Sequence, residues 1–170
     1  IKPEDTVILP GDISWGLRLS EAMPDLEWID KLPGRKLIFK GNHDLWWQSI
    51  SKLNNLYESI HFVQNKAVEV EGYHICGSRG WISPGHDDFK EADEKIYNRE
   101  QLRLQMSIDD AKAQGAEKII GVLHYPPSSN PVAGSAFTEI FEKAGVEMVI
   151  YGHLHGPDAH RSGMQGKYNG

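Results

Sequence analysis

Four short apolar runs constrain the fold of this chain more than any other feature. They are residues 6–9, 36–39, 118–123 and 146–151. Each is rich in β-branched or aliphatic residues that do not alternate with polar ones, which is typical of central strands covered on both faces. Segments with helical patterning lie between them. These are residues 19–32, 45–57, 90–114 and 136–143. The alternation of strand and helix predicts an α/β fold.

Three further runs have no room for helices between them. Residues 60–63, 67–70 and 73–76 are separated by only a few residues, and they predict a small antiparallel group in a second sheet or at a sheet edge. Residues 80–89 and 126–134 are rich in Gly, Pro, Ser and Asp, which predicts surface loops.

Length and composition indicate one soluble domain spanning residues 1–170. No apolar run is long enough to cross a bilayer. The net charge of −6, with scattered basic residues, argues against an extended nucleic-acid surface. Cys76 is the only cysteine, and the N-terminus resembles no export signal, so we expect a cytoplasmic protein. The chain begins with Ile1, which leads us to expect truncation at both ends.

Each of the four main strands is followed by polar side chains. The segments are "VILPGD" with Asp12, "LIFKGNHD" with Asn42 and His43, "GVLHYPP" with His124, and "VIYGHLHG" with His153 and His155. In open α/β sheets, ligands bind outside the carboxyl ends of the strands, so these side chains are expected to converge. Imidazole, carboxylate and amide groups together suit a first-row transition metal or zinc.

Neighbouring residues fit such a site. The preceding glycines, Gly11, Gly41 and Gly152, allow the backbone to turn sharply and approach the ions closely. A carboxylate such as Asp12 can bridge two ions roughly 3.5–4 Å apart, which together clamp a phosphoryl group during in-line attack. The sequence therefore predicts metal-assisted chemistry at phosphorus.

The motifs G-D, G-N-H-D, a lone His and G-H-x-H resemble those of the calcineurin-like metallophosphoesterases. The resemblance runs from Val7 to His155 and is greatest to the small bacterial predicted phosphohydrolases. It implies a sandwich of two mixed β-sheets flanked by helices. The family's D-x-H motif, at the end of its first strand, does not occur before Asp12. We therefore expect a fold that lacks the family's first and last strands.

The resemblance also implies an activity and a set of site residues. The activity is hydrolysis of a phosphoester, by a phosphatase or phosphodiesterase, through a hydroxide that bridges two divalent ions of Mn, Fe or Zn. Asp12 would bridge the ions, His155 would complete the first site, and the second site would contain Asn42, His124 and His153. His43 would protonate the leaving oxygen. Asp44 would either orient His43 or cap the helix expected after it.

Three further regions allow alternative interpretations. Arg79, in "CGSRGW", either binds a substrate phosphate or forms a solvent-exposed salt bridge. Trp15 belongs either to the core or to the wall of a substrate cleft. The charged segment "DEKIYNREQLRLQ" is most simply a solvated amphipathic helix, with a lid over the metals as the alternative.

Two other functions compete with phosphoester hydrolysis. One is a non-catalytic protein-binding scaffold on the same fold with a degenerate metal site. The other is a single-metal hydrolase that acts on carboxyl esters. The absent D-x-H motif is the observation that supports the scaffold. The identity of the phosphoester substrate and the oligomeric state do not follow from the sequence.

Overall fold

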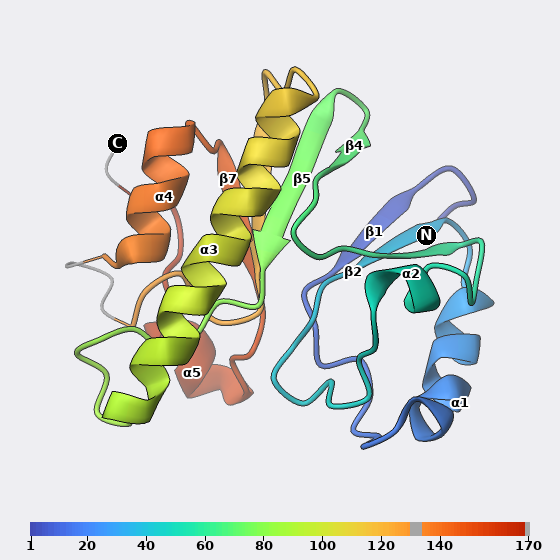
Figure 1. Ribbon diagram of the computed structural model, residues 1–170, viewed down its shortest axis with the longest axis horizontal. Helices are drawn as coiled ribbons and strands as arrows, with labels where there is room; N and C mark the ends of the chain where they lie inside the picture. The colour runs from blue at the N-terminus through green and yellow to red at the C-terminus, as the bar shows by residue number, and fades with distance from the viewer. Residues whose placement is uncertain (130–133, 169–170) are drawn as a thin grey trace.

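The computed structural model describes residues 1–129 and 134–168, which form two β-sheets flanked by helices (Figure 1). The first sheet has the order β1-β2-β3 and is parallel throughout its described strands. The second has the order β4-β5-β6-β7, with β4 antiparallel to β5 and the others parallel. The strands are β1 (Thr6–Leu9), β2 (Arg35–Ile38), β3 (Ile60–Phe62), β4 (Val68–Val70), β5 (Tyr73–Ser78), β6 (Ile119–Leu123) and β7 (Met148–Tyr151). The helices are α1 (Leu19–Asp30), α2 (Ile50–Leu53), α3 (Glu91–Ala113), α4 (Ala136–Ala144) and α5 (Gly156–Ser162).

Three clusters of buried side chains account for the layers. Leu37 and Phe39, which come from β2 and the residue after it, share a cluster with Val122 of β6, so the two sheets pack face to face. Leu26 of α1 belongs to a cluster on the outer side of the first sheet. Leu104 of α3 belongs to a cluster on the outer side of the second. The expected sandwich of two sheets flanked by helices is therefore confirmed.

The pairing of the short strands differs from the expectation. We expected β3, β4 and β5 to form one antiparallel group, but β3 pairs in parallel with β2 and β5 pairs in parallel with β6. Only β4 and β5 form a hairpin, whose turn places Glu71 and Gly72 at positive φ. The Asn54 side chain bonds both the N–H and the C=O of Phe62, which holds the end of β3 in the first sheet.

Other elements also differ from the expectation. Strands β1 and β7 lie at the edges of their sheets in the described part of the chain, so their side chains are mostly half-buried rather than covered on both faces. The helix expected at residues 45–57 is reduced to α2, because residues 44–49 form turns around the buried Trp46. Helix α5 was not expected. Within the described residues, no helix is both long and apolar enough to span a bilayer.

The strand directions position the site. Because β1 and β2 are parallel, and so are β6 and β7, the segments that follow these strands lie at the carboxyl ends of their sheets. Asp12 and Asn42 follow strands of the first sheet, and His124 and His153 follow strands of the second. The two sheets therefore each supply two of the expected ligands.

Candidate metal centre

Four side chains from the two sheets converge on one point. His124 Nε2 lies 2.7 Å from Asn42 Oδ1 and 3.3 Å from Asp12 Oδ2. His153 Nδ1 lies 3.2 Å from Asn42 Oδ1 and 3.2 Å from His124 Nε2. One ligand atom from each of Asp12, His124 and His153 lies within 4.8 Å of the others. The expected convergence of these four residues is thus present.

The protonation of His124 explains why this arrangement suits a cation. Its Nδ1 lies 3.0 Å from the carbonyl oxygen of Pro10, which can only accept, so Nδ1 carries the proton of a neutral ring. Burial lowers the pKa of His124, which favours that neutral form. Nε2 then presents a lone pair toward the oxygens of Asp12 and Asn42. Three lone-pair donors facing one another repel unless a positive ion lies between them.

His153 is also prepared to act as a ligand. Burial, and then the unfavourable interaction that a protonated His153 would have with the neighbouring His124, lower the pKa of His153 to about 4, so its imidazole is neutral at pH 7. Asp12 and His153 have φ of 57° and 70°, a left-handed conformation that is unusual outside glycine. Such conformations cost on the order of 1–3 kcal/mol and concentrate at functional sites.

Two glycines bring the ligand segments together. Gly11 has a φ of 107°, and a Cβ placed on it would overlap the backbone of Gly41. A Cβ placed on Gly41 would overlap Asp12 in turn. The segments after β1 and β2 therefore touch backbone to backbone, and the His43 N–H donates to Asp12 Oδ1 at 2.8 Å. Any larger residue at position 11 or 41 would push Asp12 away from Asn42.

Asp44 holds this junction. Its side chain is fully buried, and Oδ2 accepts from the N–H groups of Gly41 at 2.7 Å and Asp12 at 2.8 Å. Oδ1 accepts from the N–H of Ile13 at 2.8 Å and from Trp46 Nε1 at 3.2 Å, with Ser14 N–H more distant at 3.4 Å.

Neither expected role of Asp44 matches these contacts. No helix begins directly after it, since α2 starts at Ile50, so the helix-capping interpretation is wrong. None of the hydrogen bonds of the described residues joins its carboxylate to the His43 ring. Asp44 instead fixes the backbone that carries the ligands.

His43 and His155 lie beside the cluster. The His43 ring stacks on Trp15 with centroids 4.0 Å apart and planes 21° apart, and the indole is 71% exposed. Trp15 therefore belongs to the wall of the site and not to the core. His155 is exposed, and its ring centroid lies 6.4 Å from that of His153. The structure brings His155 near the cluster without including it.

Comparison with known proteins assigns the chain to a family. The sequence profile of the calcineurin-like phosphoesterase family matches residues 1–157, which is most of the chain. The chain belongs to the calcineurin-like phosphoesterase family. Among solved structures, the protein of unknown function AQ665 from Aquifex aeolicus is similar at 23% identity, with a TM-score of 0.38, covering 87% of this chain and 67% of that one. No curated protein matches.

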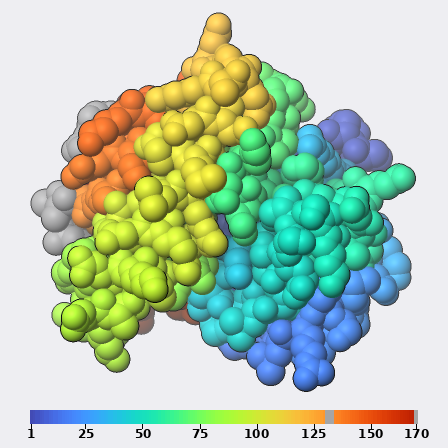
Figure 2. Space-filling view, in the orientation of Figure 1, coloured from blue at the N-terminus to red at the C-terminus, as the bar shows by residue number. Residues whose placement is uncertain are grey.

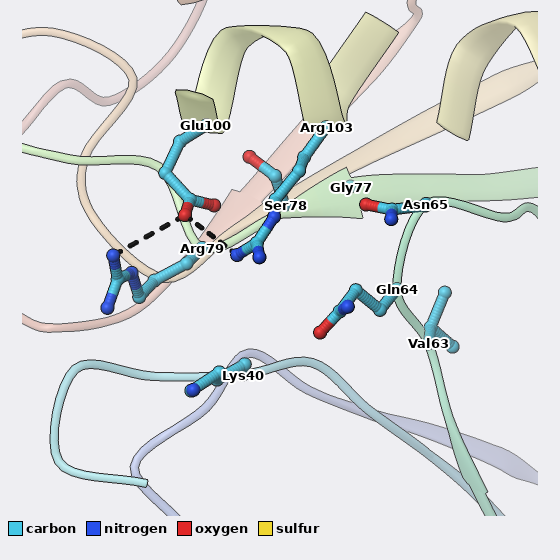
Figure 3. Close-up of a pocket in the computed structure, with 9 residues that line it drawn as sticks. All are labelled: Lys40, Val63, Gln64, Asn65, Gly77, Ser78, Arg79, Glu100 and Arg103. Atoms are coloured by element: carbon cyan, nitrogen blue, oxygen red, sulfur yellow. Dashed lines mark hydrogen bonds and ion pairs between the residues drawn. The ribbon is translucent and has the colours of Figure 1, made fainter. Parts of the chain in front are cut away.

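Arg79 lines a cleft of this calcineurin-like phosphoesterase together with Lys40 and Glu100 (Figure 3). Its guanidinium Nη2 lies 3.4 Å from Glu100 Oε1 and its Cζ lies 4.5 Å from the Trp81 ring centroid. The side chain is only 13% exposed, so the ion pair is largely buried, in contrast to the solvent-exposed pair considered above. The Arg79 carbonyl accepts from the N–H groups of His124 and Tyr125, both at 3.0 Å. Arg79 is thereby joined to the segment that carries a ligand.

Sequence reasoning missed Glu100, which is fully buried at the centre of this cleft. Its Oε1 also accepts from Arg103 Nη1 at 3.0 Å. A signal was present, because Glu100 is spaced from the apolar Tyr97 and Leu104 by three and four residues and so shares their buried helix face. The prediction of a solvated helix applies only to the opposite face of α3.

Proposed function

We propose that this chain hydrolyses phosphoesters with the help of divalent transition-metal ions. One observation carries the proposal: a carboxylate, an amide oxygen and two neutral imidazoles converge within hydrogen-bonding distances at the carboxyl ends of the two sheets. Mixed nitrogen and oxygen donors of this kind suit Mn, Fe or Zn. Membership in the calcineurin-like phosphoesterase family supports the same chemistry.

The proposed roles follow from the contacts. Asp12, Asn42, His124 and His153 would hold one ion, and bound ions would activate water and neutralise phosphoryl oxygens. For a second ion, Asp12 would act as the bridge and His155 would contribute a ligand. His43, whose backbone is fixed on Asp12, donates a proton to the leaving oxygen. Trp15 covers one face of the His43 ring and limits its movement.

Metal analysis coupled to an activity assay tests the proposal. The metal-loaded protein is expected to contain about two ions per chain and to release alcohol from a generic phosphate monoester or diester. A His153→Ala variant is expected to lose metal and activity together, whereas His160→Ala, an exposed histidine on α5, is expected to keep both. A protein that neither retains metal nor hydrolyses either ester would favour the protein-binding scaffold with a degenerate metal site.

The role of His43 has its own test. Because His43 contacts Asp12 only through its backbone, His43→Ala is expected to retain the ions while kcat falls by about 10²–10⁴. The loss is expected to be smaller for substrates whose leaving group is a weak base, since these need less protonation. An unchanged kcat with a poor leaving group would remove the general acid from the scheme.

A further inference from the structure

The cleft that contains Arg79 lies beside the candidate metal ligands, at the same edge of the two-sheet sandwich. The metal ligands follow β1 and β2 in one sheet and β6 and β7 in the other. The cleft is lined by residues that follow β2 and β3 and by the end of β5, with α3 as its third side. In each sheet, neighbouring strands therefore supply the residues of the two sites. Since adjacent strands lie about 4.8 Å apart, the two sites are separated by about 5–10 Å.

Positive charge dominates this cleft. Lys40, Arg79 and Arg103 line it, and Glu100 is the only acidic residue that does so. A single oxygen, Glu100 Oε1, pairs with both arginines, at 3.4 Å and 3.0 Å, and also lies 3.5 Å from Arg99 Nε outside the cleft. One carboxylate cannot neutralise this many cations, so the cleft carries excess positive charge.

Two of the cationic groups have binding capacity that the protein does not use. In the described part of the chain, Lys40 has no hydrogen bond or ion pair, although its side chain is half-buried and lies across the cavity from Arg79 and Glu100 in Figure 3. Arg79 Nε is buried and has no acceptor within residues 1–129 and 134–168. Leaving a buried donor or a half-buried charge without a partner is costly, and an anion would accept from both of these groups. The buried oxygens Glu100 Oε2 and Asn65 Oδ1 of the same cleft also lack a partner among the described residues, and they need a donor such as water.

The shape of the cleft limits what can enter it. The cavity has a volume of about 10 Å³, enough for one water or one oxygen atom of an anion. The side chain of Arg103 is 30% exposed, so one wall of the cleft is open to solvent. Figure 2 shows the corresponding hollow between the yellow surface of α3 and the cyan and green surface beside it. A tetrahedral or planar anion can therefore insert an oxygen while the rest of the ligand remains outside.

We infer that this cleft, lined by Lys40, Arg79 and Arg103, binds a second anionic group of the substrate, a phosphate or carboxylate held beside the metal centre. The inference rests on the proposed function and narrows its substrate class to phosphoesters that carry another anion within about 5–10 Å of the scissile phosphate. Lys40 is the discriminating residue, because it lies two positions before Asn42 and its side chain has no partner among the described residues. Glu100 pairs with Arg79 and Arg103 and thereby positions both side chains in the cleft.

A matched pair of substrates and variants tests the inference. The substrates are propyl phosphate and propane-1,3-diyl bisphosphate, which differ only in the second anion. In the metal-loaded enzyme, Lys40→Met is expected to raise KM for the bisphosphate about tenfold more than KM for propyl phosphate. Arg103→Gln provides a second, partly exposed position where the same direction is expected. Lys52→Met, at an exposed lysine on α2, is the control and is expected to leave both KM values unchanged.

A binding measurement separates this inference from the proposed function. Calorimetric titration of the metal-loaded protein with inorganic phosphate is expected to show one site fewer in Lys40→Met than in wild type or Lys52→Met. If neither ester is hydrolysed but this site is lost, the proposed function fails and the anion cleft stands. If phosphate binding does not depend on Lys40, or if an active enzyme shows equal KM changes for the two substrates, the anion cleft is refuted.

Discussion

Replacing Asp44 with asparagine would test how the ligand segments are held. The substitution keeps the size of the side chain and replaces one acceptor oxygen with an NH₂ group that can only donate. Whichever way the amide is oriented, one set of contacts is lost: either the Gly41 and Asp12 N–H groups lose their acceptor, or the Ile13 and Ser14 N–H groups do. Trp46 Nε1 keeps Ser14 O as an acceptor in both cases.

The magnitude follows from the number of donors left without a partner. Each buried donor that loses its acceptor costs about 1–3 kcal/mol, so two of them lower the free energy of unfolding by about 2–6 kcal/mol. A domain of this size has a stability of about 5–15 kcal/mol, so a measurable folded population remains. Because the Asp12 segment would also move, metal affinity is expected to fall with stability.

Urea denaturation in the presence of a chelator measures this effect without a contribution from bound metal. The control is Asp109→Asn, an exposed position on α3 that is expected to stay within about 0.5 kcal/mol of wild type. An Asp44→Asn protein as stable as this control would refute the reasoning. A lower kcat with unchanged stability and metal content would instead indicate that Asp44 orients His43.

Three further outcomes follow from the described contacts. The pKa of His153 is lowered to about 4 in the folded protein, so below pH 6.5 the unfolded chain binds more protons than the folded chain. In urea titrations, the free energy of unfolding of the metal-free protein is therefore expected to fall from pH 6.5 toward pH 4. The fall is expected to be smaller in His153→Gln. Burial raises the pKa of the Cys76 thiol to about 12, so Cys76 is expected to resist a disulfide reagent such as DTNB until the protein unfolds. Rapid labelling of the native protein would contradict this burial. Trp15→Ala is expected to lower kcat about 2- to 10-fold without loss of metal, because one aromatic stack is lost, whereas Trp28→Ala, at another exposed tryptophan, should leave kcat unchanged.

The main strands and the ligand cluster could be predicted because both depend on local patterns. Continuous apolar runs identified β1, β2, β6 and β7, and the polar residues after each run identified Asp12, Asn42, His124 and His153. The rule that parallel strands place their carboxyl ends at one edge was then enough to bring these residues together. His155 follows the same pattern but lies on the exposed side of the cluster, at the start of α5.

The parts that could not be predicted depend on tertiary contacts. The pattern at residues 45–57 favours a helix, yet Trp46 is buried with its indole N–H directed at Ser14 O and Asp44, which requires an irregular backbone there. The short strand β3 could pair with either neighbour, and the contacts of Asn54 place it beside β2. The role of Asp44 depends on donors from a segment some thirty residues away.

The division of the ligands between the two sheets has a consequence for folding. Asp12 and Asn42 come from one sheet and His124 and His153 from the other, so neither half of the protein can hold the cation alone. Metal affinity is therefore thermodynamically linked to the docking of the halves, and each tenfold rise in free metal above its Kd adds about 1.4 kcal/mol to that association. A bound ion would therefore add a second link between the two sheets, beside the apolar cluster that they share.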